Sequence, residues 1–501
     1  MLGQLLHGFG TILASPSLIL VLLLGVGAGI MVGALPGLTA TMGVALLVPL
    51  TFGMPPIAAM LMLVGVYVGA IYGGSISAIL LRTPGTPAAA ATVLDGFALA
   101  QQGKAGKALS TSTIASFVGG IVSAMALTFI APQLATFALR FSSPEYFALA
   151  LLGLTIIASI SGDSIVKGLI AGMLGLMLSM MGMDPLTGYA RFTFGSIDLL
   201  SGISFVPVLI GLFAVSEAFA AVEQILTKTT VDTKFANQLL TWKEIKGISW
   251  TSIKSAIIGT FIGIIPGAGA DIAAFVSYGE AKRSSKHPEK FGTGILEGVA
   301  APEAGNNGVT GGAMVPLLTL GIPGDATTAV MLGALMMLGL RPGPLLFKDN
   351  GDVVYAVFAG LLIANVFMLI YGLFGVKLFA RILTVPRVIL TPIIFILCVV
   401  GAYAINNSMF DVWAMLLFGF IGYIMQKLKF PISPIVLALI LGPMAEGEFR
   451  RALMMSQGNL SIFATRPIAA ILLVLSIISV VQSIMKQRKA KLAKAQAVAA
   501  E

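Results

Sequence analysis

Two aspartates lie next to proline–glycine pairs inside apolar stretches of the sequence. Asp271 follows Pro266-Gly267 in the run GIIPGAGADIAA, and Asp325 comes directly after Pro323-Gly324. A carboxylate at the centre of a bilayer costs about 2.5 to 3.5 kcal/mol on insertion scales, so such a residue usually has a function and a partner. The expected partner of each acid is a hard monovalent cation or a proton.

The proline–glycine pairs are expected to interrupt helices at membrane depth. Proline lacks a backbone donor and glycine relaxes the chain, so peptide groups beside each pair lose their helical partners. In lipid such groups need protein, water or a ligand to pair with. Exposed helix N-termini can bind an anion and unwound carbonyls a cation, so the pattern predicts an ion and substrate site. A simple kink, and close helix packing through small residues, remain alternatives.

The composition of the chain is that of a membrane protein. Of the 501 residues, 57% are hydrophobic and 10% are charged, whereas charged residues make up about 25% of soluble domains. Apolar windows of roughly 20 residues recur along the chain without the period-2 alternation of a β-barrel. We therefore expect an all-α polytopic membrane protein with about 10 to 12 transmembrane helices.

The net charge of +9 is explained by membrane topology. Lys and Arg lie in short loops and in the C-terminal tail, as the positive-inside rule describes, so we expect a cytoplasmic tail, a lipid bilayer environment and no nucleic-acid partner. With the single cysteine Cys398 and two histidines, we expect no disulfide within the monomer, no transition metal and no cofactor.

Two halves of the chain carry the same order of motifs. In each half an apolar stretch ends in Gly-x-x-Pro-Gly, and a Gly-Gly pair then precedes a second Pro-Gly. The loop after the first stretch is uncharged in the first half (51–56) and basic in the second (282–290), so the pattern predicts an inverted repeat. We place the first repeat at 1–226 with a re-entrant hairpin near 73–93, a cytoplasmic linker at 227–254, the second repeat at 255–465 with a hairpin near 305–330, and a last helix with the tail at 466–501.

Long motifs in both halves resemble one transporter family. They are GALPGLTATMGVALLVPLTF and GVYVGAIYGGSISAILLRTPGTPAAAATVLDG in the first half, and the whole run of residues 263–344, from GIIPGAGAD to GLRPGP, in the second. These runs resemble the large membrane subunit of the tripartite tricarboxylate transporters, and the likeness covers nearly the whole chain. The resemblance implies an elevator-type secondary transporter, driven by cations, that imports citrate and other carboxylates across the bacterial inner membrane. It also implies a small four-helix membrane subunit and a periplasmic solute-binding protein as partners, and it is compatible with a homodimer.

We assign candidate roles at these motif positions. Substrate binding is predicted for Ser75, Ser77, Arg82, Thr83, Gly85, Thr86, Asn306, Asn307, Thr310, Gly324 and Thr327. Ion binding is predicted for Pro36, Gly37, Thr39, Thr41, Pro266, Gly267, Gly269, Asp271 and Asp325. Na⁺ is the expected ion, and a proton carried by Asp271 or Asp325 is the alternative.

Other functions are weighed against this hypothesis. Importing a dianion against 100 mV costs about 4.6 kcal/mol, at about 2.3 kcal/mol per charge, which the entry of cations can offset. A passive anion channel is one alternative, and an intramembrane aspartyl protease that uses Asp271 and Asp325 is another. The sequence has neither a phosphate-binding Gly-x-x-x-x-Gly-Lys-Ser/Thr loop nor a His-Glu-x-x-His motif, so we expect neither an ATP-driven pump nor a zinc enzyme.

Overall fold

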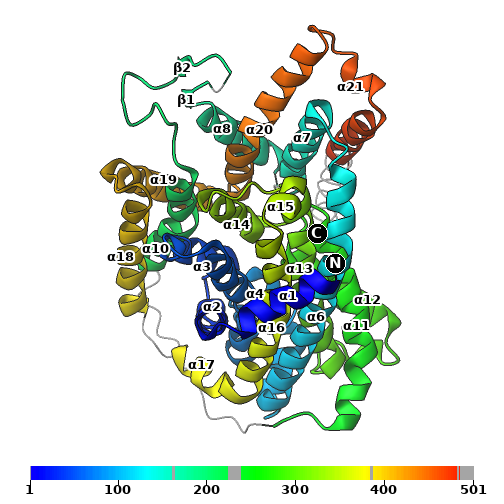
Figure 1. The fold of residues 1–501 in the computed structure, drawn as a ribbon. Helices are drawn as coiled ribbons and strands as arrows, with labels where there is room; N and C mark the ends of the chain where they lie inside the picture. Colours follow the sequence, from blue (N-terminus) through cyan, green and yellow to red (C-terminus); the bar gives the residue numbers. More distant parts are fainter. Residues whose placement is uncertain are drawn as a thin grey trace, which may run out of the picture. The chain divides into compact units, whose positions relative to one another are not determined.

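The computed structural model describes residues 2–160, 164–184, 186–223, 238–383, 387–481 and 485. Within these residues the regular structure is almost entirely helical (Figure 1). Two short strands, β1 (Gly182–Met183) and β2 (Ala190–Arg191), pair as an antiparallel hairpin. The prediction of an all-α protein is therefore confirmed for the described chain.

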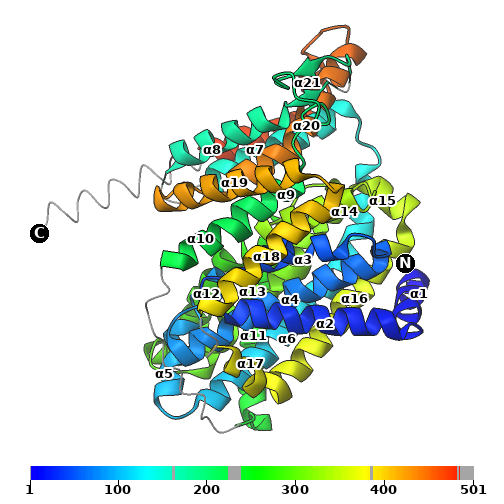
Figure 2. The same ribbon diagram turned by 90° about the vertical axis from the view of Figure 1, so that its left-hand side faces the viewer.

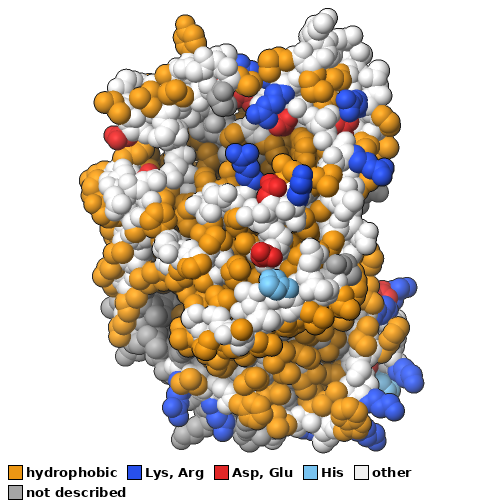
Figure 3. Space-filling view, viewed as in Figure 1, with side chains coloured by type: hydrophobic (Ala, Val, Ile, Leu, Met, Phe, Trp, Pro, Cys, Tyr) orange, Lys and Arg blue, Asp and Glu red, His pale blue; other side chains and the backbone are white. Residues whose placement is uncertain are grey.

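Several helices have the length and composition of membrane spans. Six of the described helices qualify: Pro16–Ala34, Pro56–Leu81, Ala105–Ala138, Trp242–Ile264, Gly351–Arg381 and Met409–Lys427. Shorter apolar helices cover Ala40–Thr51, Ile165–Ser179, Phe205–Ala220, Ala326–Met337, Thr391–Asn406 and Pro467–Val481. Hydrophobic side chains cover much of the face drawn in Figure 3. These features support a multi-pass membrane protein, whereas the expected number of 10 to 12 spans stays a prediction.

The chain divides into two compact units. Unit 1 consists of Met1–Thr136 and Glu217–Asn407, and unit 2 consists of Phe137–Ser216 and Ser408–Glu501. Each unit takes residues from both predicted repeats, and the Pro-Gly motifs of both repeats belong to unit 1. The repeat boundaries stay a prediction. Residues 227–237 of the predicted linker and the basic residues of the tail lie outside the described residues, and from Trp242 the predicted linker is part of a helix.

Equivalent helix pairs form the centre of unit 1. Helix α2 (Pro16–Ala34) packs on α4 (Pro56–Leu81), as Figure 2 shows, and α11 (Trp242–Ile264) packs on α13 (Leu296–Leu320). A Cβ added to Gly29 would lie 2.3 Å from the Val66 carbonyl oxygen, and one added to Gly259 would lie 2.0 Å from the Gly305 carbonyl oxygen. Close packing through small residues, one of the two alternatives above, therefore applies to both glycine-spaced stretches.

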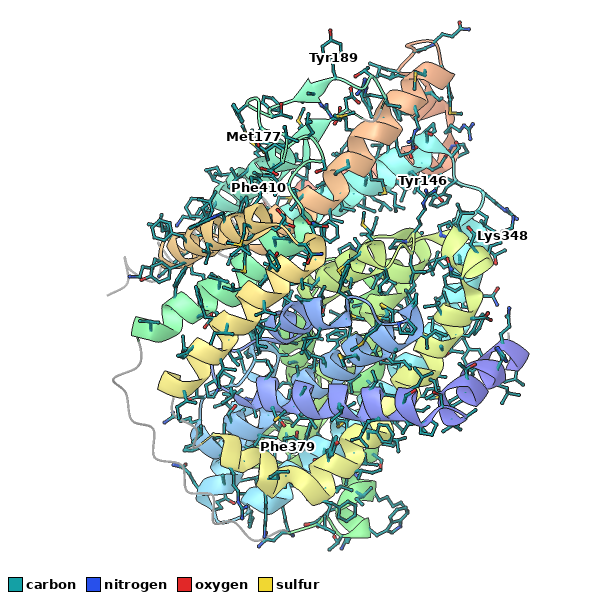
Figure 4. The ribbon with its side chains drawn as sticks, turned by 60° about the vertical axis from the view of Figure 1, so that its left-hand side comes forward. Tyr146, Met177, Tyr189, Lys348, Phe379 and Phe410 are labelled. Carbon is teal, nitrogen blue, oxygen red and sulfur yellow. The ribbon has the colours of Figure 1, made fainter. Side chains whose placement is uncertain are left out.

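Shorter helices and further spans surround these pairs. They are α1 (Leu2–Leu13), α3 (Ala40–Leu47), η1 (Pro49–Thr51), η2 (Pro87–Ala89), α5 (Val93–Gln101), α6 (Ala105–Ala138), α10 (Ser216–Glu223), α12 (Ala270–Ser284), η4 (Pro288–Lys290), α14 (Ala326–Met337), α15 (Pro344–Asp349), α16 (Gly351–Ile370), η5 (Tyr371–Gly375), α17 (Val376–Ile382) and α18 (Arg387–Asn406). Helix α16 packs on α1, α2 and α4. The exposed Lys348 of α15 points outward (Figure 4), as expected for the charged loop that follows the second repeat motif.

Unit 2 is built around one long helix, α20 (Ser433–Met455). It packs on α7 (Ser143–Ile160), α8 (Ile165–Ser179) and α9 (Phe205–Leu209). The other elements are η3 (Ile210–Val215), α19 (Met409–Lys427), α21 (Ile462–Thr465) and the helix Pro467–Val481. Two ion pairs join the loop that carries β1 and β2 to α20: Arg191 with Glu446 at 2.6 Å and Asp184 with Arg450 at 2.8 Å. Tyr189, in the turn between the strands, points away from unit 2 (Figure 4).

Candidate functional site

The first Pro-Gly pair of each half lies between two helices. Helix α2 ends at Ala34 and α3 begins at Ala40, and α11 ends at Ile264 and α12 begins at Ala270. Between them Gly37 has φ of 94° and Gly267 has φ of 83°, a conformation that residues with a side chain rarely adopt. The predicted interruptions are therefore present, with the same residue spacing in both halves.

The second Pro-Gly pairs also follow helix ends. Helices α4 and α13 end at Leu81 and Leu320, and the next residues, Arg82 and Gly321, both adopt the left-handed conformation. With 26 and 25 residues, α4 and α13 are long enough to cross a hydrocarbon core of about 30 Å. The polar stretches that begin at 73 and 305 are thus parts of continuous helices up to these ends. The re-entrant hairpins stay a prediction.

Within each half the two interruptions lie against each other. A Cβ on Gly85 would lie 2.0 Å from the Gly33 carbonyl oxygen and 2.9 Å from Gly74 Cα. A Cβ on Gly324 would lie 2.7 Å from the Gly263 carbonyl oxygen and 2.5 Å from Ala313 Cα, which are the matching positions of the second half. Glycine is required at both places because neighbouring backbone occupies the space of a side chain.

The two halves meet at the starts of the short helices. Helix α3 of the first half packs on α14 of the second, and α12 of the second half packs on η2 of the first. At the first of these contacts, the buried hydroxyl oxygens of Thr41 and Thr327 lie 3.0 Å apart. Residues from the predicted ion set and the predicted substrate set are therefore neighbours.

Asp325 caps a helix of the second half and also accepts a hydrogen bond from the first half. It caps α14: its Oδ1 accepts from the Thr328 N–H at 2.8 Å, and the Thr328 hydroxyl oxygen accepts from the Asp325 N–H at 2.9 Å. Its Oδ2 accepts a hydrogen bond of 2.6 Å from the hydroxyl of Tyr67, on α4 of the other half. The predicted ion and substrate residues did not include Tyr67, which was interpreted as a packing residue, and the only sequence signal for it was a hydroxyl group within an apolar stretch. Asp325 is 9% exposed, so little of its surface reaches solvent.

Several predicted substrate ligands are buried inside α4 and α13. Ser75, Ser77 and Thr310 donate to the carbonyls of Tyr72, Gly74 and Asn307 in their own helices. Such bonds also occur where a hydroxyl only packs. Asn306 and Asn307 are buried in α13. These residues are thus within unit 1, with part of their hydrogen-bonding capacity used by neighbouring groups.

Residues after the end of α4 differ in exposure. Arg82 and Thr83 are exposed, and the Arg82 guanidinium lies 5.8 Å from the centre of the Phe97 ring. Thr86 is buried, and its hydroxyl oxygen has no hydrogen-bond partner. Thr86 occupies the position of the first half that corresponds to Asp325, directly after the second Pro-Gly. A free hydroxyl and a carboxylate therefore hold equivalent places in the two halves.

The remaining predicted ion ligands lie at the starts of α3 and α12. Thr39 caps α3 by accepting from the Met42 N–H at 3.1 Å, and Gly269 is the residue before α12. Asp271 is exposed in the first turn of α12, where the helix dipole favours a negative charge. Pro36 and Pro266 are half-buried beside them.

Comparison with known proteins identifies the family. The model of the Tripartite tricarboxylate transporter TctA family matches residues 19–437. The chain belongs to this family. A TctA protein is the membrane subunit of a tripartite tricarboxylate transporter, so the chain is a transporter subunit that works with a small membrane subunit and a solute-binding protein.

Two proteins of Agrobacterium vitis are similar to this TctA protein in sequence. It is 38% identical, over 98% of both chains, to an Agrobacterium vitis protein described as "Uncharacterized 52.8 kDa protein in TAR-I ttuC' 3'region". It is 37% identical to a second A. vitis protein, "Uncharacterized protein in TAR-II ttuC' 3'region", over 46% of this chain and 96% of that protein. The crystal structure of the Eremococcus coleocola manganese transporter, in complex with an aromatic bis-isothiourea substituted compound, is 13% identical with a TM-score of 0.15, covering 85% of this chain and 95% of that one. That likeness is too weak to bear on the fold.

Proposed function

We propose that this TctA protein imports a di- or tricarboxylate together with Na⁺, and that the four Pro-Gly interruptions form the binding region. In this proposal a periplasmic solute-binding protein delivers the substrate to the bacterial inner membrane, and the basic tail lies in the cytoplasm. The observation that supports it best is the contact between Thr41 and Thr327. Interruptions of both halves meet there, inside one compact unit.

The chemistry of the interruptions suits an anion and its companion cations. Helix α12 begins just after an interruption and has no side-chain cap, so it offers N–H groups and the positive end of its dipole to a carboxylate, whereas Thr39 and Asp325 already cap α3 and α14. The unpaired Thr86 hydroxyl is a further group for a substrate oxygen. Carbonyls that do not continue a helix, together with the Asp325 carboxylate, offer oxygen ligands to Na⁺.

The energetics favour coupling to cations over passive flow. A dianion that enters against an inside-negative potential of 100 mV requires about 4.6 kcal/mol, and three entering monovalent cations make the net charge movement favourable. Because the motifs of both halves belong to unit 1, an elevator-type cycle in this proposal moves unit 1 as the substrate carrier.

The test is uptake by the reconstituted three-component system. Proteoliposomes with both membrane subunits receive the solute-binding protein loaded with one carboxylate from a panel, with and without an inward Na⁺ gradient. We expect accumulation above equilibrium only with the Na⁺ gradient, and none in vesicles that lack the solute-binding protein. Uptake that stops at equilibrium would favour the passive channel, and accumulation driven by a pH gradient alone would favour the proton-coupled alternative.

A further inference from the structure

Helix α13 carries a buried acid, Glu303, that is not among the predicted ion and substrate ligands. Glu303 lies about two turns from the start of the helix and is 0% exposed. Among the described residues no Lys, Arg or His forms an ion pair with it. A carboxylate buried without a positive partner is costly, so its charge has to be neutralised by a bound cation or by a proton.

Two buried hydroxyl groups donate to the Glu303 carboxylate. Its Oε1 accepts from the hydroxyl of Thr92, the residue before α5, and its Oε2 accepts from the Ser116 hydroxyl of α6 at 3.1 Å. The Asn306 amide also lies beside this carboxyl group, and the Ser112 hydroxyl near it donates to Ser75. Thr92, Ser112 and Ser116 are each 0% exposed, so the cluster is shielded from solvent within unit 1.

A buried acceptor without a partner lies one turn along the same helix. Asn307 follows Glu303 by four residues, so both side chains lie on the same face of α13. The Asn307 amide nitrogen donates to the Glu303 carbonyl oxygen at 3.1 Å and to Asn306 Oδ1 at 2.8 Å. Its own Oδ1 is buried and has no hydrogen-bond partner. Buried polar atoms are nearly always paired, so this one calls for a missing partner.

We propose that Glu303, Thr92, Ser116 and Asn307 form a Na⁺ site, distinct from the Pro-Gly interruptions, that holds one of the coupling ions. The ligand atoms are a carboxylate, two hydroxyls and an amide oxygen, which is a set for a hard cation and not for a transition metal. The ion neutralises Glu303 and supplies a partner for Asn307 Oδ1. This inference rests on the Na⁺ coupling proposed above.

The position of the site connects it with the substrate ligands. Asn306 Nδ2 donates to the Ala88 carbonyl oxygen in η2 at 3.0 Å, and the Ser112 hydroxyl donates to Ser75 at 2.6 Å. Ser75 and Asn306 both belong to the predicted substrate set. An ion at Glu303 therefore holds α5, α6 and α13 in one arrangement and strengthens substrate binding. Bound substrate in turn strengthens Na⁺ binding by the same free energy.

The test compares variants of the complete reconstituted transporter. Glu303→Gln keeps the shape of the side chain and removes its charge. We expect it to transport one Na⁺ fewer per substrate, measured from parallel ²²Na⁺ and carboxylate uptake. Thr92→Val removes one ligand oxygen, and we expect it to raise the Na⁺ concentration for half-maximal uptake by about tenfold or more. Thr92→Ser keeps the oxygen and is the matched control, expected to resemble the unmodified protein.

A second measurement does not depend on transport. Na⁺ raises the unfolding temperature of a protein whose folded state binds it. We expect a smaller Na⁺-dependent rise for Glu303→Gln and Thr92→Val than for Thr92→Ser, with all three folded in the absence of Na⁺. If either variant fails to fold, the other still provides the comparison.

The outcomes separate this inference from the proposed function. Uptake by the unmodified complex that needs no Na⁺ would reject the proposed coupling. Na⁺-driven uptake with an unchanged Na⁺ count in Glu303→Gln and an unchanged Na⁺ requirement in Thr92→Val would reject the Glu303 site alone. A changed pH dependence in Glu303→Gln, with an unchanged Na⁺ count, would also reject it, because the carboxyl would then carry a proton.

Discussion

The hydroxyl oxygens of Thr41 and Thr327 lie 3.0 Å apart in the interior of unit 1, although 286 positions separate the two residues in the chain. Thr41 belongs to the first turn of α3, after the first Pro-Gly of the first half, and Thr327 belongs to the first turn of α14, after the second Pro-Gly of the second half. Their contact brings interruptions of opposite halves together. It is therefore the most direct place to test whether the two halves form one site.

Replacing each threonine by valine, singly and together, tests whether the Thr41 and Thr327 hydroxyls stabilise each other. In Thr41→Val or Thr327→Val the other hydroxyl stays buried and unpaired, so we expect each variant to lose about 1 to 3 kcal/mol of stability. The double variant should lose less than the sum of the two single losses. Unfolding measurements on all three variants test this, and we expect uptake to fall as well. Thr111→Val is the control, because that buried hydroxyl donates only to the Lys107 carbonyl of its own helix. Strictly additive losses would contradict the coupling.

The hydrogen bond from Tyr67 to Asp325 should matter more for transport than other buried tyrosine contacts. Tyr67→Phe removes one donor from the carboxylate while the cap with Thr328 remains, so we expect a folded protein that is less stable by about 1.5 to 3 kcal/mol. Its Na⁺-driven uptake should fall. In the control Tyr72→Phe the lost hydroxyl contacts Thr113 and not an acid, so uptake should fall less. Equal losses would argue against a role of Asp325 in ion binding.

Alanine at the second Pro-Gly pairs should disrupt folding. In Gly85→Ala and Gly324→Ala the new methyl group would lie 2.0 Å and 2.5 Å from its nearest backbone atoms. Backbone cannot move aside cheaply, so we expect a loss of about 1 to 3 kcal/mol or more, seen as reduced yield and a lower unfolding temperature. Gly279→Ala has open space around the new methyl group in α12 and should be neutral or stabilising by up to about 1 kcal/mol. A stable, active Gly324→Ala protein would contradict the proposed packing.

The inverted repeat predicts opposite membrane sides for two equivalent loops. Single cysteines replace the exposed Phe52, after the first Pro-Gly of half one, and the exposed His287, after the first Pro-Gly of half two. The buried native thiol is removed by Cys398→Ser. A membrane-impermeant maleimide should label Phe52→Cys from the periplasmic side and His287→Cys from the cytoplasmic side. Labelling of both from one side would reject the inversion.

The ion pair between Asp184 and Arg450 in unit 2 predicts that the stability of the protein depends on pH. The Thr187 hydroxyl, the Arg450 guanidinium and the Leu186 N–H donate to Asp184 and lower its pKa below the ordinary 3.8. A lowered folded-state pKa means that this carboxylate stabilises the fold above about pH 4 and loses that effect as the pH falls below it. Asp184→Asn should therefore unfold at a lower temperature than the unmodified protein at pH 7, with a smaller difference near pH 3. A difference in unfolding temperature that grows as the pH falls would contradict this prediction.

The interruptions could be predicted from sequence because their cause is local. Proline has no amide hydrogen and glycine tolerates positive φ, so a Pro-Gly pair ends a helix wherever it stands. Both halves confirm this with helix ends at Ala34 and Ile264 and new starts at Ala40 and Ala270. The membrane class follows equally directly from composition.

Partners across the chain could not be predicted in this way. Thr41 meets Thr327, Tyr67 meets Asp325, and Thr92 meets Glu303, across 286, 258 and 211 positions. No local pattern encodes such pairs, because they depend on how whole helices pack. The sequence alone thus established where the chain must break and which residue types stand there. The tertiary structure decided which of them face one another, since a buried hydroxyl or carboxylate takes the partner that helix packing places beside it.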